Sequence, residues 1–336
     1  MASDELSPLV APADHTVRIN DRSKKAIILK LTLGGALLVL ALWLIQDHGR
    51  SASAPKGSYI CGVTNSSAGH IKLANKEDDH YFYWFFESRT NPETDPLVLW
   101  LTGGPGSSSM FALLTENGPC TIQPDLSTKL NPYAWNTNAN VIWLDQPTGV
   151  GYSFGSPADK DFNETNSCNN SDPNSACDDH PLIREYLNSP EVRKYLNVDE
   201  RAPAWHEDND EVETTFTTDG DWSMPFHQFV AEMLDDGLRV LIYAGDADLM
   251  CNWIGNRAWT LELDWQGKDG YNAVKEKVFI AHDPLLPDGS NIDAGVVRSF
   301  ENFAFVRVYD AGHMVPMNQP AVSLDLINRF FTNKTL

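Results

Sequence analysis

Four short apolar runs, each followed at once by glycine and polar residues, limit the folds that are open to this chain. They are LVLWL at 97–101, VIWL at 141–144, VLIY at 240–243 and FAFVRV at 303–308. Because none of them alternates clearly between apolar and polar residues, we expect strands that are buried on both faces. The sequence therefore predicts an α/β fold with a mostly parallel central sheet and flanking helices. Functional residues would collect at the carboxyl ends of its strands.

Other segments support this organisation. The aromatic stretch HYFYWFFES at 80–88 predicts a further strand in a hairpin. Helical spacing is found at 181–196, with a break near Pro190, at 224–237 and at 321–331. Residues 155–180 hold almost no apolar side chains and are expected to form a loop.

Size and charge narrow the class of protein. The 336 residues, 42% of them hydrophobic, are enough for one large α/β domain or two small ones. The formal net charge of −21 opposes binding to nucleic acid and to anionic lipid headgroups, so we expect no nucleic-acid partner. The sequence does not indicate an oligomeric state.

An apolar stretch at 26–45 is long enough to cross a membrane, and basic residues crowd its N-terminal side. The positive-inside rule then predicts a cytosolic tail at 1–25, a transmembrane segment at 26–45, a linker at 46–57 and a lumenal or extracellular domain at 58–336. A signal peptide cleaved after the small residues 52–54 would instead give a secreted protein. We favour the anchor because the charged leader is long for a signal. A buried core helix is disfavoured because the stretch is apolar on all faces.

Sequons and cysteines fit a lumenal or extracellular location. All four sequons lie beyond the apolar stretch, at Asn65, Asn163, Asn169 and Asn333. The chain has five cysteines, of which Cys168 and Cys177 flank a short polar loop and could pair. The odd number leaves at least one thiol free or paired with another molecule.

The stretch GYSFG at 151–155 fits the pattern G-x-S-x-G, in which a nucleophilic serine sits between a strand and a helix. Ser153 lacks that context. It lies well beyond the apolar run that ends at Leu144, and the polar loop follows it. We therefore do not expect Ser153 to be a nucleophile. Ser107, Ser108 and Ser109 follow a predicted strand more closely, in the loop TGGPGSSS.

Residues typical of a hydrolase follow the other predicted strands. Asp246 and Asp248 come after one run and His313 after another, and the order acid then histidine is that of α/β-hydrolases. An acid is needed there to fix the histidine tautomer. Gly103 and Gly104 would let backbone N–H groups approach an oxyanion.

Four blocks of the chain together resemble the serine carboxypeptidases, a family of α/β-hydrolases. They are PLVLWLTGGPGSSSMFALLTENGP, NPYAWNTNANVIWLDQPTGVGYSFG, LIYAGDADLMCNWIGNRAW and VYDAGHMVPMNQP. The blocks are long, occur in the family's order and span about residues 56–336. The resemblance implies a peptidase that releases C-terminal amino acids from peptides or proteins, with no cofactor and no metal, in a vacuole-like or lysosome-like compartment or elsewhere in the secretory pathway.

The resemblance also implies roles for individual residues. Asp248 and His313 would be catalytic, and Gly104 would supply one oxyanion N–H. Glu116 would be one of a carboxyl pair that grips the C-terminal carboxylate of the substrate. The other substrate-binding positions would be Thr102, Gly103, Cys251 and Met314. Thr102 stands where many members have asparagine.

The family's nucleophile lies in a motif G-E-S-Y-A/G-G, which this chain lacks. After Gly155 the chain leaves the family pattern and rejoins it near CDDHPLIREYL, so the resemblance implies an internal deletion near 155–180. The central strand would be missing too, and its neighbours would either pair directly or expose their edges. We therefore expect impaired or absent activity. The alternatives are a non-catalytic relic (a splice form, a damaged gene model or a pseudoenzyme) or a carboxypeptidase-like acyltransferase or lyase, which would need the same serine.

Overall fold

The computed structural model describes residues 60–74, 76–156, 180–286 and 290–336. The apolar stretch at 26–45, the sequons at Asn163 and Asn169, and the pair Cys168 and Cys177 lie outside the described residues. Within the described ranges, no helix is long and apolar enough to cross a membrane.

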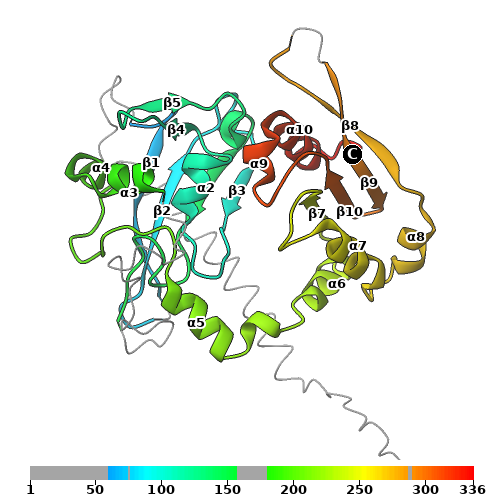
Figure 1. Cartoon of the computed structure of the whole chain (residues 1–336), viewed down its shortest axis with the longest axis horizontal. Helices are drawn as coiled ribbons and strands as arrows, with labels where there is room; N and C mark the ends of the chain where they lie inside the picture. The colour runs from blue at the N-terminus through cyan, green and yellow to red at the C-terminus, as the bar shows by residue number, and fades with distance from the viewer. Residues whose placement is uncertain (1–59, 75, 157–179, 287–289) are drawn as a thin grey trace, which may run out of the picture. The chain divides into compact units, whose positions relative to one another are not determined.

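The described strands form two four-stranded sheets and one small ribbon (Figure 1). The first sheet has the order β1 (Ser66–Lys72), β2 (His80–Phe86), β6 (Asn140–Leu144), β3 (Leu97–Trp100). The second has the order β7 (Val240–Gly245), β10 (Phe303–Val308), β9 (Asn291–Phe300), β8 (Lys277–His282). The ribbon pairs β4 (Cys120–Ile122) with β5 (Thr128–Leu130). All four apolar runs are confirmed as strands, and so is the aromatic strand β2 in its hairpin with β1.

The expectation of a mostly parallel sheet is wrong for the described residues. Only β3 with β6 and β7 with β10 are parallel. The pairs β1–β2, β2–β6, β9–β10 and β8–β9 are antiparallel. Three strands of these antiparallel pairs, β1, β8 and β9, were not predicted from the sequence. Strands that follow one another closely in the chain pair antiparallel, because a parallel pair needs a long crossover connection.

The strands β3 and β7 each end a sheet, and in the described part of the chain neither pairs with a strand on its outer side. Burial on both faces is therefore wrong for β3: Leu99 is 41% exposed and Leu101, just beyond the strand, is 48% exposed. The large apolar residues of β7, at 240–243, are only half-buried. In the described residues, β3 and β7 do not pair with each other.

The helices agree with the sequence where their periodicity is clear. The segment 181–196 forms α3 (Pro181–Asn188) and α4 (Pro190–Tyr195), and the break falls at Ser189, whose hydroxyl caps α4. The segment 224–237 gives α6 (His227–Asp235), and Gly237 follows it with a φ of +84°, a conformation that favours glycine. The other helices are α2 (Ser109–Thr115), α5 (Asp210–Thr218), α7 (Trp253–Glu262), α8 (Lys268–Ala273), α9 (Val315–Asn318), α10 (Pro320–Phe331) and the 3₁₀ turns Trp135–Thr137 and Asp221–Ser223.

Helix α10 is buried against the cores of both sheets. Leu324 and Ile327 belong to the core cluster of the first sheet. Val322 and Leu326 belong to a core cluster of the second sheet. The indole of Trp135 also donates a hydrogen bond of 3.1 Å to a serine of α10. A single helix therefore contributes apolar side chains to two cores.

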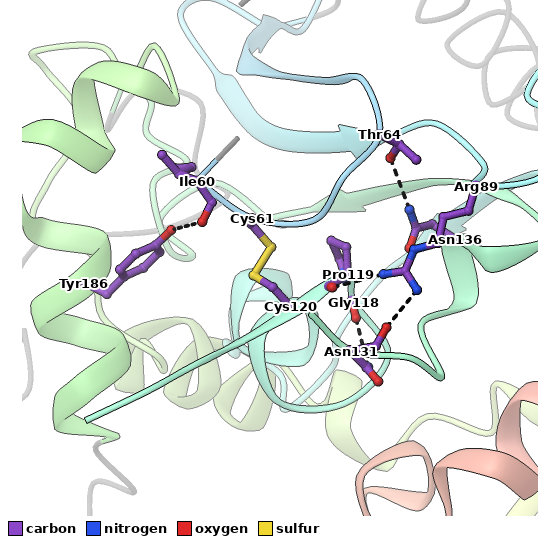
Figure 2. The surroundings of a disulfide bond; sticks show 10 residues. All are labelled: Ile60, Cys61, Thr64, Arg89, Gly118, Pro119, Cys120, Asn131, Asn136 and Tyr186. Atoms are coloured by element: carbon purple, nitrogen blue, oxygen red, sulfur yellow. Dashed lines mark hydrogen bonds between the residues drawn. A yellow bond between two sulfur atoms is a disulfide. The ribbon is translucent and has the colours of Figure 1, made fainter. Parts of the chain in front are cut away.

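A disulfide between Cys61 and Cys120 fastens the start of the described domain to β4 (Figure 2). The two cysteines are 59 residues apart in sequence, and both are buried. Beside the disulfide, the hydroxyl of Tyr186 donates to the carbonyl of Ile60, and Arg89 donates to two further carbonyls. This pairing was not predicted from the sequence. It agrees with an oxidising compartment.

Candidate active site

Asp248 and His313 form a hydrogen-bonded pair. Asp248 lies in the loop after β7, and His313 lies in the loop after β10. Because β7 and β10 pair in parallel, their carboxyl ends lie side by side and bring the two loops together. Asp248 Oδ2 and His313 Nδ1 are 2.9 Å apart. The structure thus brings together the acid and the histidine that the sequence had singled out.

The local backbone holds Asp248 in place. Its other oxygen, Oδ1, accepts hydrogen bonds from the N–H groups of Met250 at 2.9 Å and Cys251 at 3.1 Å. The Asp248 side chain is 6% exposed, whereas that of His313 is 61% exposed. Within the described residues, His313 Nε2 has no hydrogen-bond partner. The imidazole is therefore oriented on one side and accessible on the other.

Asp246 and Gly245 hold the two loops against each other. Asp246 accepts hydrogen bonds from Arg307 at 3.2 Å and from the N–H of Asp310 at 2.9 Å. A Cβ atom at Gly245 would lie 2.3 Å from the carbonyl oxygens of Ala311 and Gly312, so only glycine fits. Asp246 thus supports the loop that carries His313 and has no contact with the imidazole itself.

Glu116 lies at the end of α2 and interacts electrostatically with His313. Burial raises the pKa of Glu116 to about 7, and the charge of His313 acts in the opposite direction. Burial raises the pKa of Tyr243 in β7, and the charge of Glu116 adds to that rise. Glu116 is therefore close to both residues. Tyr243 was predicted only as part of a strand, because nothing in VLIY marks it as a site residue.

The glycine loop after β3 is open to solvent, and both Gly103 and Gly104 are exposed. A Cβ atom at Gly104 would lie 2.6 Å from the hydroxyl oxygen of Ser107, whereas one at Gly103 would meet nothing within 4 Å. Thr102 is fixed at the start of this loop. Its N–H donates to Ser109 Oγ at 3.0 Å, and its hydroxyl accepts from the Trp100 indole at 2.7 Å.

The four serines considered in the sequence all donate their hydroxyl hydrogen bonds away from His313. Ser153 is fully buried, and its Oγ donates to the carbonyl of Asp145 at 2.8 Å and accepts from a backbone N–H of β2. Ser108 Oγ donates to the Asp145 carboxylate at 2.6 Å. Ser109 donates to the carbonyl of Leu144, and Ser107 donates to a carboxylate oxygen of Asp208.

The remaining predicted residues have varied surroundings. Cys251 is a free, exposed cysteine, and burial together with the nearby Asp248 carboxylate raises its pKa. Potential ligand atoms of Cys251, Asp248 and His313 lie within 4.8 Å of one another, a spacing that would also suit a metal ion. Met314 packs against the core of the first sheet. The sequon residues Asn65 and Asn333 are exposed.

Comparison with known proteins gives consistent results. The sequence model of the family described as Serine carboxypeptidase matches residues 61–171 and 161–333. Carboxypeptidase Y homolog A of Sclerotinia sclerotiorum is 31% identical over 402 residues, covering 78% of this chain and 72% of the relative. Carboxypeptidase Y of Candida albicans is 30% identical over 423 residues, covering 84% and 76%. The crystal structure of KEX1(delta)p, a prohormone-processing carboxypeptidase from Saccharomyces cerevisiae, has a TM-score of 0.66 at 20% identity, covering 80% of this chain and 91% of that one.

The relatives are longer than this chain in the aligned region. Both sequence alignments are longer than the 336 residues of this chain, so the relatives contain residues that have no counterpart here. The two segments matched by the family model meet at 161–171, within the range 157–179 that lies outside the described residues.

Proposed function

Because this chain belongs to the serine carboxypeptidase family, and is by family a peptidase, we propose that its site is built to release C-terminal amino acids from peptides through an acyl-enzyme. The observation that carries this proposal is the hydrogen bond of 2.9 Å between Asp248 and His313. The carboxylate is buried and the imidazole exposed, which is the arrangement that a general base needs.

The roles of the pair follow from this geometry. Asp248 accepts a hydrogen bond from the N–H at His313 Nδ1 and so keeps the proton on that nitrogen, which leaves Nε2 unprotonated and able to take a proton from a serine hydroxyl. When His313 becomes charged, the buried carboxylate stabilises the imidazolium. His313 Nε2 then gives this proton to the leaving amine, which completes formation of the acyl-enzyme. In the second half of the reaction, Nε2 takes a proton from the water that hydrolyses the acyl-enzyme and returns it to the serine oxygen.

Glu116 supplies the preference for a free C-terminus. A carboxyl with a pKa of about 7 is protonated at acidic pH and can donate a hydrogen bond to the carboxylate of a substrate. Once ionised, Glu116 would repel that carboxylate. The N–H of the exposed Gly104 would bind the oxyanion, while Gly103, Thr102, Cys251 and Met314 would contact the substrate.

The chain as given lacks the nucleophile and is therefore inactive in this proposal. The hydroxyls of Ser107, Ser108, Ser109 and Ser153 donate to acceptors other than His313, which supports this conclusion. The alignments that exceed the length of the chain support a deletion, and the junction of the two segments matched by the family model at 161–171 supports its position near 155–180. Without a nucleophile, a triad retains only residual catalysis from the oxyanion site and from binding.

The test compares the full chain with a version in which the corresponding segment of an intact relative replaces residues 155–180. Both are assayed with an N-blocked dipeptide at about pH 5, and a restored version that carries His313→Ala is the matched control. We expect turnover only in the restored chain with His313 intact. Turnover by the unrestored chain that a serine-directed inhibitor blocks would refute the assignment, because a serine already present would then be the nucleophile.

The origin of the deletion has a separate test. A splice form, a damaged gene and an erroneous gene model all give the same protein sequence, but they differ in the messenger RNA. Sequencing the transcript across residues 155–182 distinguishes them. A transcript that encodes G-E-S-Y-A/G-G in this interval would mean that the natural protein carries the nucleophile.

The location is also part of the proposal. Residues 26–45 anchor the protein as a single-pass membrane segment with the domain at 58–336 in the lumen or outside the cell. The disulfide between Cys61 and Cys120 supports an oxidising compartment for that domain. Secretion after cleavage of a signal is the alternative.

A further inference from the structure

A cavity of about 210 Å³ lies between α7 and the second sheet. It is separate from the residues assigned to catalysis. Trp253 and Arg257 of α7 line it, together with apolar residues and arginines of β9 and β10. A water molecule occupies about 30 Å³ of liquid volume, so this space can hold a small polyatomic ion or several waters.

The lining of this cavity is strongly basic. Arg257, Arg298 and Arg307 all contribute to it, against the single carboxylate of Glu276. That carboxylate is shared, because its Oε1 accepts from Arg257 Nε at 2.5 Å and from Arg298 Nη2 at 3.3 Å. Arg307 is paired at 3.2 Å with Asp246, which does not line the cavity. Such a concentration of cations is unusual in a chain with a formal net charge of −21.

The three guanidinium groups also have more N–H donors than the surrounding residues have acceptors for them. Each guanidinium has five N–H donors. Arg298 is 10% exposed and its Nη1 donates to three carbonyls, but its Nε has no acceptor within the described residues. The buried Nε of Arg307 has none either. Arg257 donates only through Nε, to Glu276. Its two terminal nitrogens make no hydrogen bond within the described residues.

Two of the arginines are held in position before any ligand arrives. The guanidinium of Arg307 lies over the ring of Trp253, 4.0 Å from its centre, and it is also paired with Asp246. The three carbonyl contacts of Arg298 Nη1 fix its orientation in the same way. Positively charged donors that are already oriented lose little conformational entropy when they bind an anion.

We propose that this cavity is a binding site for a small oxyanion, with Arg257, Arg298 and Arg307 as its cationic residues. Arginine donors match the oxygens of phosphate and carboxylate in pairs, so these two groups are the chemical classes that the lining fits. The proposal does not depend on the peptidase assignment, and its test measures binding instead of turnover.

The test is isothermal titration calorimetry of the full chain with inorganic phosphate, and in a second arm with acetate, at about pH 7.5 and constant ionic strength. Arg257→Gln removes one cation and is compared with Lys277→Gln, which removes the same charge from an exposed position on β8. We expect saturable binding that weakens at least tenfold in Arg257→Gln and stays unchanged in Lys277→Gln. The anion that binds more tightly identifies the class.

Absence of saturable binding of either anion to the wild-type chain would overturn the proposal. Equal affinity in the wild type and in Arg257→Gln would also overturn the proposal, because the anion would then not be bound by the Arg257 side chain. Should Arg257→Gln not fold, as judged by circular dichroism, Arg257→Lys takes its place. Lysine keeps the charge but loses the paired donors, so its affinity should fall below that of the wild type. Unchanged affinity in this variant would count against the site.

Discussion

Replacing Glu116 by glutamine should remove a pH-dependent loss of stability. Burial raises the pKa of Glu116 from 4.5 to about 7 in the folded chain, so the folded state prefers the protonated carboxyl. At a pH below the unfolded-state pKa, the Glu116 carboxyl is protonated in both the folded and the unfolded chain, so it does not reduce the folding stability. As the pH rises towards 7, the unfolded chain ionises first and folding becomes less favourable. Glutamine is neutral throughout and lacks this effect.

The size of the effect follows from the two pKa values. Raising a carboxyl from 4.5 to about 7 corresponds to about 3 kcal/mol of folding free energy, fully lost once the pH exceeds the folded-state value. The free energy of unfolding of the wild type, minus that of Glu116→Gln, should therefore fall by about 3 kcal/mol between about pH 4 and about pH 8. The comparison across pH cancels any packing difference between glutamate and glutamine.

Urea unfolding of both proteins at the two pH values, followed by circular dichroism, measures this difference. Glu93→Gln, at an exposed turn position, removes the same charge and serves as the matched control. Its difference from the wild type should change little with pH. A difference for Glu116→Gln that is equally independent of pH would refute the reasoning, because the carboxyl would then be solvated in the folded chain.

Three further predictions have simple tests. Ser153→Ala should leave fluorophosphonate labelling unchanged but lower the free energy of unfolding by about 1–3 kcal/mol, because buried backbone groups lose their partner; loss of labelling would contradict this. Cys61→Ser combined with Cys120→Ser should lower the free energy of unfolding in urea by about 4 kcal/mol, because the disulfide closes a long loop. A reductant should lower the stability of the wild type by the same amount and leave that of the variant unchanged. Glycan mapping should find Asn65 modified on a protein that still carries residues 26–45, whereas a mature N-terminus near residue 55 would mean that this stretch is a cleaved signal.

The sequence predicted the strands well because their apolar runs are short and clearly bounded. It also predicted which side chains meet at the site, because Asp248 and His313 both follow strands directly. Their pairing needs only that β7 and β10 be adjacent and parallel. Burial was predicted less well. The run that forms β3 is as apolar as a central strand, but it lies at the end of a sheet, and the composition of a strand does not specify its neighbours.

Contacts between residues that are far apart in the chain could not be predicted from the sequence, for a different reason. Cys61 and Cys120 are 59 residues apart, and five cysteines allow many pairings, so no local pattern selects this one. Tyr243 and Glu116 are more than 100 residues apart in the sequence, and only the tertiary structure brings their charges within reach of each other. Helix α5 was missed because Val212 is its only buried residue, and its periodicity is correspondingly weak.

The position of α10 has a consequence for how this chain denatures. Its apolar residues are divided between two cores, so melting of either core exposes apolar side chains of α10 even while the helix stays docked on the other core. This helix near the C-terminus therefore couples the unfolding of the two cores. With α10 in place, calorimetry should give a single transition whose van't Hoff and calorimetric enthalpies agree. Shortening the chain before Pro320 should separate that transition into two, with each sheet melting at its own temperature.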